Sequence, residues 1–451
     1  MSSKKTTNSV SNSKGLFRGS FALIGYRLGA ILVSYFFTWL IARLYGASVV
    51  GMFALMNVVV LIGVLLSKSG LDTLFLREIS KLKGRDDNVE RQKTYSLILG
   101  IQLFTGLGVS LLIYSFSDLI ALRIFDQSEL GPILKYAAFI VLPLTYTTLH
   151  AEGMRGSGKL FWYLSFTRVW PYALAALAML GLYVNEVEDS NWFFFGYFAS
   201  VVASSVFALW IWLRESQLKM RWSVDLKASS ALLRQSFPML LSSSMFLLMS
   251  WTDTFMLGLF EDTTQVGYYH VAVKVSNMVA IVLYGINGIS APKIASSWAA
   301  KDTSTLSKVI SSAATLSFTL SLPVVFGILF FRSELLAMFG EGMHTASYAL
   351  IFLSLGQFVN GSCGSVMNIL QMTGHQKYGQ YILISAGLLN VTLNYLLIPT
   401  YGIEGAAVAT GVSTAYWNLL SVMVVRWKIG HWSFPFATGI NDVVKLIKGR
   451  F

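Results

Sequence analysis

Ionisable residues lie inside long hydrophobic stretches of this 451-residue chain, where a charge is costly to bury. The deepest are three cations and one acid: Arg27, Arg168, Lys274 and Asp253. Groups at such depth normally face a protein interior or a water-filled cavity. Arginine gives a phosphate two parallel hydrogen bonds and lysine gives it a point charge, so the cations predict a cavity for a phosphate-bearing anion. The alternative is bonding to backbone carbonyls of neighbouring helices.

The acid, Asp253, has more than one interpretation. Asp253 and Lys274 lie at matching depths in consecutive hydrophobic segments, so an ion pair or hydrogen bond would allow both to be buried. Alternatively, Asp253 is a protonatable or cation-binding acid coupled to transport, or it simply reaches water at the outer surface. Coupling would make H⁺ or Na⁺ the ion that is used, and the sequence indicates no other cofactor.

Neutral polar side chains also follow helical spacing in two later segments. Asn390 and Asn394 are one turn apart, and one face of the preceding segment carries Gln357, Asn360, Gly361, Gly364, Asn368 and Gln371. Such a face is typical of interhelical hydrogen bonding and close packing in membrane bundles. The alternative is a hydrophilic lumen for sugars, which need many amide partners. In that case the cavity is lined by Gln357, Asn360, Asn368, Asn390 and Asn394.

Motifs for enzyme chemistry and for nucleic-acid binding are missing from the sequence. It has no Walker A glycine loop, no His/Cys metal-ligand spacing and no nucleophile elbow, and its 5 histidines are scattered. The net charge of +12 fits basic cytoplasmic loops better than a nucleic-acid surface. Without an ATP site, the energy for transport must come from an ion gradient, the membrane potential or the substrate gradient.

The elements that carry these residues are predicted to be membrane-spanning helices. The chain is 55% hydrophobic and only 12% charged, whereas a soluble domain is about one quarter charged. Apolar runs of about 20 residues, long enough to cross the hydrocarbon core, recur from end to end. We place twelve spans, at 17–42, 48–67, 94–115, 132–151, 160–183, 192–213, 236–259, 267–291, 308–331, 346–372, 378–398 and 403–425.

Charge alternates between successive connections, which sets the predicted orientation. If the N-terminus is cytoplasmic, most of the 34 Lys and Arg residues fall in cytoplasmic connections, and the outer ones hold only Arg43, Arg123 and Arg332. The outer connections are acidic instead. We therefore predict that both termini are cytoplasmic.

A weak internal repeat divides the chain into two halves. Gly51 and Gly267 each open a span, Gly158 and Gly374 each follow one, and both pairs are 216 residues apart. Six spans per half give parallel topology, with the substrate path between the halves. The predicted organisation is a cytoplasmic tail, a first six-helix bundle, a basic linker, a second six-helix bundle and a second cytoplasmic tail, at 1–16, 17–213, 214–235, 236–425 and 426–451.

Several of these segments resemble a known family. Residues 44–80 read LYGASVVGMFALMNVVVLIGVLLSKSGLDTLFLREIS, the seventh and eighth spans contain DTFMLGLF and VGYY, and the fourth and tenth end in GSGK and TGHQK. In order and spacing these motifs are similar to the Wzx-type polysaccharide or O-antigen flippases of the multidrug/oligosaccharidyl-lipid/polysaccharide exporter superfamily. The resemblance covers about residues 15–430.

The resemblance implies a fold and a function. The fold would be all-α and MATE-like, with two six-helix bundles around a V-shaped cavity and alternating access. The substrate would be an undecaprenyl-diphosphate-linked oligosaccharide, such as an O-antigen or other lipopolysaccharide repeat unit, turned to the periplasmic leaflet of the bacterial inner membrane. A polysaccharide polymerase and a chain-length regulator would be partners. Arg27, Arg168 and Lys274 are proposed for the head group from depth and charge, not from a family motif.

Two other functions compete with this one. A MATE-type multidrug or cation antiporter would have carboxylates rather than bases in its cavity, and the cations outnumber the acid here. A membrane polysaccharide polymerase or ligase would have a long outer loop bearing Arg and His, and no outer connection here is long.

Overall fold

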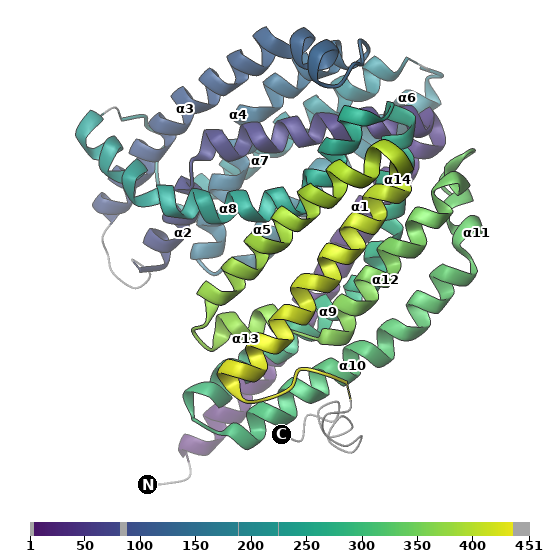
Figure 1. The fold of residues 1–451 in the computed structure, drawn as a ribbon. Coiled ribbons are helices and arrows are strands. Elements are labelled where there is room, and N and C mark those ends of the chain that lie inside the picture. The colour runs from purple at the N-terminus through teal and green to yellow at the C-terminus, as the bar shows by residue number, and fades with distance from the viewer. Residues whose placement is uncertain (1–3, 82–87, 188, 224, 436–451) are drawn as a thin grey trace. The chain divides into compact units, whose positions relative to one another are not determined.

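The structure, a computed structural model, describes residues 4–81, 88–187, 189–223 and 225–435; the side chains of 4–24, 88, 242, 243 and 245–249 are not described. The first residues of the predicted N-terminal tail, 1–16, and most of the C-terminal tail, 426–451, lie outside these ranges. The described chain is helical throughout (Figure 1). Its α-helices are α1 (Lys4–Lys68), α2 (Leu71–Lys81), α3 (Asn88–Leu119), α4 (Leu130–Gly156), α5 (Leu160–Leu164), α6 (Trp170–Val184), α7 (Ser190–Ser216), α8 (Leu226–Phe260), α9 (Thr263–Ala299), α10 (Thr303–Phe330), α11 (Arg332–Ala337), α12 (Ser347–Cys363), α13 (Val366–Met372) and α14 (Gln376–Ile429). Two π-helical turns, η1 (Ile120–Ile124) and η2 (Ser165–Val169), and one 3₁₀ turn, η3 (Met343–Ala346), complete the order.

The number of separate helices of membrane-spanning length differs from the twelve predicted spans. Among the described residues, eight helices are long and apolar enough to cross a membrane, or nine if the bent pair of Met343–Cys363 and Val366–Met372 is one span. One reason is that α1 and α14 each contain two predicted spans. The 54 residues of α14 would extend about 80 Å as one straight helix, far more than a bilayer. Each helix is instead kinked at a glycine of positive φ, at Gly46 (φ 81°) and Gly402 (φ 54°).

The described chain forms two compact units, neither of them continuous in sequence. Unit 1 comprises Met1–Leu40, Val60–Ser117 and Pro132–Leu241. Unit 2 comprises Ile41–Val59, Asp118–Gly131 and Ser242–Phe451. Unit 2 therefore contains two pieces from the first half of the sequence. The bundles 17–213 and 236–425 remain a prediction.

The core of unit 1 forms where α2, α3, α4 and α7 meet. Phe75, Tyr95 and Trp212 are fully buried there, with ring centroids 5.6 to 6.0 Å apart. A side chain at Gly153 of α4 would put its Cβ 2.6 Å from the Trp212 ring, so only glycine permits this approach. Helix α2 contributes Leu71, Leu74, Phe75 and Ile79 to this core, and its buried acid, Asp72, is paired with Lys68.

Unit 2 contains a close crossing of the second segment of α1 with the start of α9. A Cβ at Gly51 would lie 1.7 Å from the Thr263 carbonyl oxygen, and one at Gly267 would lie 1.9 Å from the Ala47 carbonyl oxygen. Helix backbones touch in this way only where glycine is present. Ser48 and Thr263 share a hydrogen bond of 2.8 Å across the contact. The two glycines that the repeat makes equivalent thus pack against each other symmetrically.

The repeat is also visible in two helix ends. Gly158 and Gly374 have φ values of 82° and 80°. In the first turn the Lys159 N–H bonds to the Met154 carbonyl at 2.8 Å, and in the second the His375 N–H bonds to the Leu370 carbonyl at 2.7 Å. Both turns are glycine-closed helix ends of one kind. Their agreement at the same offset supports the internal repeat.

Candidate functional site

Arg168 lies in the π-helical turn η2, which joins α5 to α6 in unit 1. In this turn the Trp170 N–H bonds to the Ser165 carbonyl, five residues back. Pro171 follows, and because proline has no N–H it cannot continue the α-helical pattern through the turn. Single π turns inside helices are frequent at functional sites. The side chain of Arg168 is exposed and lies within electrostatic range of the Tyr172 hydroxyl.

Arg27 lies on α1, beside a contact between α1 and η2. The neighbouring Tyr26 forms a 2.6 Å hydrogen bond with Ser165, and its ring lies 4.6 Å from that of Phe161. Phe37 lies three turns further along α1, and the centre of its ring is 5.4 Å from that of the Tyr172 ring. The side chain of Arg27 is exposed. The structure therefore brings the two segments that carry Arg27 and Arg168 together in unit 1.

Neither arginine has a hydrogen-bond or ion-pair partner within the described part of the chain. Both lie inside predicted spans, where an unpaired guanidinium facing lipid is costly. Their exposed positions are consistent with an aqueous cavity. An anionic ligand would supply the missing counter-charge.

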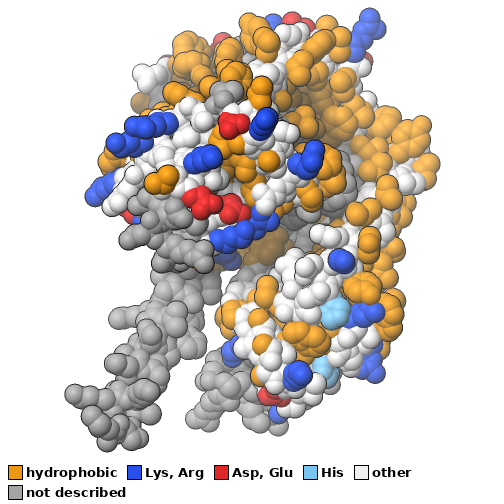
Figure 2. Space-filling model, turned by 90° about the vertical axis from the view of Figure 1, so that its left-hand side faces the viewer, with side chains coloured by type: hydrophobic (Ala, Val, Ile, Leu, Met, Phe, Trp, Pro, Cys, Tyr) orange, Lys and Arg blue, Asp and Glu red, His pale blue; other side chains and the backbone are white. Residues whose placement is uncertain are grey.

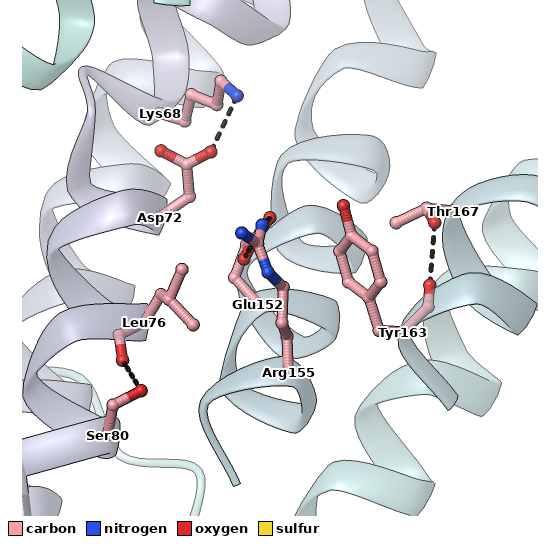
Figure 3. Close-up of polar contacts among 8 residues, drawn as sticks. All are labelled: Lys68, Asp72, Leu76, Ser80, Glu152, Arg155, Tyr163 and Thr167. Atoms are coloured by element: carbon pink, nitrogen blue, oxygen red, sulfur yellow. Dashed lines mark hydrogen bonds and ion pairs between the residues drawn. The ribbon is translucent and has the colours of Figure 1, made fainter. Parts of the chain in front are cut away.

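Several cations at the predicted cytoplasmic end of unit 1 differ from these two arginines, because they are paired with acids (Figure 3). Lys68 at the end of α1 contacts Asp72 of α2 at 2.7 Å. Arg155 of α4 donates to both oxygens of Glu152, at 3.2 and 3.1 Å, and its guanidinium lies 5.4 Å from the centre of the Tyr163 ring. Lys68, Asp72 and Arg155 all act electrostatically on Glu152.

This end of unit 1 also holds the ion pair of Lys159 with Glu215. Figure 2 shows a face of the molecule on which basic and acidic side chains are interspersed and hydrophobic side chains cover much of the remaining surface. A cavity of about 280 Å³ lies beside Glu215 and is lined by Ile79, Arg91, Ser157, Trp212, Glu215, Ser216 and Leu218. It contains neither Arg27 nor Arg168, so we do not assign the anion to it.

Asp253 is buried in unit 2, near the end of α8. One of its carboxylate oxygens accepts hydrogen bonds from Tyr269 at 2.5 Å and from Thr410 at 3.0 Å. The two hydroxyls lie 3.2 Å apart, so the three side chains form one closed network of α8, α9 and α14. The predicted pair of Asp253 with Lys274 stays a prediction. Lys274 is half-buried on α9, one turn beyond His270, on which its charge acts.

The predicted polar face of unit 2 is divided by a helix break. Gly364 has φ 68° and separates α12 from α13, which are bent by 42°, so the single continuous face predicted from Gln357 to Gln371 was wrong. A Cβ at Gly364 would meet the Ala314 Cα at 2.9 Å, which is why the chain turns there at a glycine. Before the break, Gln357 bonds to Asn277 and to Asn360, each at 3.1 Å.

The other predicted amides differ in exposure. Asn368 on α13 is half-buried, whereas Asn390 and Asn394 on α14 are buried and joined by a 3.1 Å hydrogen bond. The asparagines thus bond to each other inside unit 2, where the Asn394 Oδ1 atom has no hydrogen-bond partner among the described residues. The accessible amides of the predicted set are Gln357, Asn360 and Asn368. Whether they contact a sugar stays a prediction.

Outside the spans, two acids of unit 2 have shifted pKa values. Hydrogen bonds from Thr305 and Ser304 lower the pKa of Asp302 to about 2, because this carboxylate caps the start of α10. Partial burial, together with the charges of Asp262 and Glu404, raises the pKa of Glu261. Among the described residues no group of three or more His, Cys, Asp or Glu side chains could hold a metal ion.

The sequence analysis missed three features of these sites. It did not identify the π turn around Arg168, although Pro171 is its signal. It did not pair Tyr26 with Ser165, which are 139 residues apart. It also did not find Tyr269 and Thr410 as partners of Asp253, because periodicity shows which face a residue occupies but not which helix lies opposite.

Comparisons with known families and sequences agree on one group of proteins. The family model described as "Polysaccharide biosynthesis protein" matches residues 16–298, more than half of the chain, and the MatE model matches residues 238–396. A protein of Haloferax volcanii described as a probable low-salt glycan biosynthesis flippase, Agl15, is 32% identical over 45% of this chain and 48% of its own length. A probable flippase of the same organism, AglR, is 30% identical over 38% of this chain and 37% of its own length. The matched part is about half or less of each relative.

Solved structures give the same fold at low sequence identity. The lipid II flippase MurJ in an inward closed conformation is similar with a TM-score of 0.76 and 14% identity, over 94% of this chain and 90% of its own. An inward-facing MATE family multidrug resistance transporter of the MOP superfamily is similar with a TM-score of 0.72 and 14% identity, over 90% of this chain and 98% of its own. The fold is therefore that of an all-helical, multi-pass membrane protein.

Proposed function

The chain belongs to the polysaccharide biosynthesis protein family, a group of flippases and transporters rather than enzymes, and from this premise we propose that it flips a lipid-linked oligosaccharide. The substrate is a polyprenyl diphosphate that carries a glycan, with undecaprenyl diphosphate and an O-antigen-type repeat unit as the specific form. The glycan crosses inside the protein while the lipid tail remains in the bilayer. The description of Agl15 supports the glycan, and the descriptions of both relatives support a flippase. Arg27 and Arg168, which have no ion-pair partner within the described part of the chain, support the diphosphate.

The proposal extends to topology and place. We infer twelve spans in two six-helix bundles, both termini in the cytoplasm, and transport by alternating access to the outer leaflet of the inner membrane. The alternating charge of the connections supports this orientation. A polymerase with its chain-length regulator would then use the flipped unit.

One observation carries the function. Arg27 and Arg168 are exposed in unit 1 and have no carboxylate partner among the residues that the structure describes, whereas Lys68, Arg155 and Lys159 of the same unit are paired with acids. A diphosphate has two charged phosphoryl groups, and guanidinium groups bind phosphate oxygens in pairs. Lys274 of unit 2 is the third cation that we assign to the head group.

The test is to remove the unpaired cations. In proteoliposomes, Arg27→Ala and Arg168→Ala should each slow the flipping of a diphosphate-linked oligosaccharide by about tenfold or more, since one charge-assisted hydrogen bond contributes about 1.5–3 kcal/mol. The double variant should be inactive, and cells carrying it should lack surface polysaccharide. Arg155→Ala, which removes a cation already paired with Glu152, is the matched control and should have a smaller effect. A double variant that reaches the membrane and flips substrate at the normal rate would refute the proposal.

A second function remains worth testing because of Asp253. Its buried carboxylate, bonded to two hydroxyls, can hold a proton or Na⁺, and a MATE-type cation antiporter would use such an acid to bind its substrate. We assign Asp253 instead to ion coupling. Asp253→Asn should then abolish the effect of an imposed H⁺ or Na⁺ gradient while diphosphate binding persists. If the arginine variants transport normally and Asp253→Asn blocks export of a lipophilic cation, the antiporter is the correct function.

A further inference from the structure

The side-chain hydroxyls of η2 fix the shape of the turn that carries Arg168. Ser165 donates to the Phe161 carbonyl and Thr167 donates to the Tyr163 carbonyl, each at 2.7 Å. Such bonds to the carbonyl four residues back are known to bend helices. These two bonds give the Phe161 and Tyr163 carbonyls hydrogen-bond partners from the next turn of the same helix. They do not by themselves determine where along the helix the extra residue of the π turn sits.

Tyr26 adds a contact from outside the turn. Because the single hydroxyl proton of Ser165 is given to Phe161, the Tyr26 hydroxyl must be the donor in the 2.6 Å bond to Ser165. The Tyr26 ring is also held, 4.6 Å from Phe161 and tilted by 45°. Tyr26 of α1 therefore contacts both Ser165, the first residue of η2, and Phe161, which lies one turn earlier.

The position of the π turn decides where Arg168 points. Successive residues of a helix are about 100° apart, so moving the extra residue past Arg168 would rotate its side chain by about that angle. Ser165 begins the turn, and Tyr26 fixes this first residue through its hydrogen bond. We propose that Tyr26 is a positioning residue, which holds Arg168 beside Arg27 so that the two guanidinium groups bind one diphosphate.

This inference rests on the proposed function and adds a specificity to it. Two phosphoryl groups on one ligand need two cations at a fixed separation, and Tyr26 precedes Arg27 directly in α1 while it bonds to the turn of Arg168. A monophosphate can be bound by either arginine alone. Loss of the Tyr26 bond therefore weakens diphosphate binding and leaves monophosphate binding nearly unchanged.

The experiment compares two lipids on purified full-length protein in nanodiscs. Dissociation constants are measured for undecaprenyl diphosphate and undecaprenyl monophosphate with Tyr26→Phe and Ser165→Ala. Each variant should weaken diphosphate binding about tenfold, and monophosphate binding by less than about twofold. Thr167→Val is the matched control, because it removes a hydroxyl bond of the same length from the same turn, a bond made to Tyr163 and not to α1. It should change neither constant by more than about twofold.

Three results separate the possible failures. If Tyr26→Phe weakens both lipids equally, or neither, Tyr26 does not position Arg168 and this inference is overturned. If Tyr26→Phe still weakens diphosphate binding in an Arg168→Ala background as much as in the wild type, Tyr26 does not act through Arg168. If Arg27→Ala together with Arg168→Ala binds the diphosphate normally, the proposed function itself fails, whatever Tyr26 does.

Discussion

Unit 1 and unit 2 treat polar side chains within the membrane region in different ways. Unit 1 uses full charges: the pairs Lys68–Asp72 and Arg155–Glu152 lie at one end, and the exposed Arg27 and Arg168 lie deeper. In unit 2 a buried carboxylate, Asp253, is bonded to two neutral hydroxyls, and amides bond to each other. Ion pairing makes these charges tolerable in unit 1, whereas the Asp253 carboxylate of unit 2 is stabilised by hydrogen bonds from neutral groups.

The internal repeat shows that this difference lies in side chains rather than in backbone. The turns at Gly158 and Gly374 have the same conformation, yet the helices that lead into them carry different chemistry. At the repeat offset, Glu152 and Arg155 correspond to Asn368 and Gln371. An ion pair in one half thus corresponds to two amides in the other. We infer that the two halves kept a common backbone frame while their polar side chains diverged.

The strongest way to break this comparison is to remove one partner of a charge pair in unit 1. Lys68→Met leaves Asp72, whose side chain is 6% exposed, without its cation and next to Glu152. One oxygen of Asp72 already has no hydrogen-bond partner among the described residues. We expect the free energy of unfolding to fall by about 3 kcal/mol, because the change leaves a charge buried without its partner. Chemical denaturation in detergent measures the loss.

A double variant supplies the control for that measurement. Lys68→Met with Asp72→Asn removes both charges, so it should recover most of the lost stability. If the double variant is as unstable as Lys68→Met alone, charge pairing is not what stabilises this end of unit 1.

Much of the fold follows from hydropathy, because the thickness of a bilayer limits the length of a span. Ten of the twelve predicted spans lie within helical structure, while 308–331 passes the end of α10 by one residue and 346–372 crosses the break at Gly364. The two glycines that define the predicted offset, Gly51 and Gly267, lie at one helix crossing. The number of separate helices did not follow, since Gly46 and Gly402 continue their helices through a kink where a loop was expected. Only the backbone angles of those two glycines distinguish the alternatives.

The candidate site was predicted less completely, because it depends on contacts between distant segments. Depth alone identified Arg27 and Arg168 as cations inside spans. The turn that presents Arg168 has no period of its own, since the same residues could form a regular helix up to Pro171. For Asp253 the predicted partner was Lys274, the base at matching depth in the next span. The bond to Thr410 spans 157 residues, and no local pattern indicates it.

A smaller effect should sharpen the description of unit 2. Tyr269→Phe deletes one of the two hydroxyls that donate to Asp253 and leaves that acid less satisfied. The expected loss is about 1–3 kcal/mol of unfolding free energy, the cost of a buried polar group deprived of a partner. Tyr416→Phe removes an exposed hydroxyl that lies 3.4 Å from Ser385, so it should cost much less. Equal losses in the two variants would mean that the network around Asp253 contributes no stability of its own.

The smallest effect concerns Glu261, an acid of unit 2 between α8 and α9. The charges that shift its pKa belong to other acids. Partial burial, Asp262 and Glu404 raise its pKa above that of the unfolded chain. A raised pKa means that the folded protein binds this proton more tightly. The contribution of Glu261 to stability is therefore complete below the unfolded pKa, about 4.3, and is lost as the pH rises through the raised value.

Glu261→Gln imitates the protonated form and should stabilise the protein at pH 7.5 by a few tenths of a kcal/mol, a small gain because solvent screens this half-exposed group. The advantage should disappear near pH 4. Denaturation midpoints at both pH values measure it, with Glu129→Gln at an exposed position of unit 2 as the control for loss of one negative charge. A Gln variant that is less stable at pH 7.5 would show that Glu261 has a favourable partner, and that unit 2 relies on charge pairing as unit 1 does.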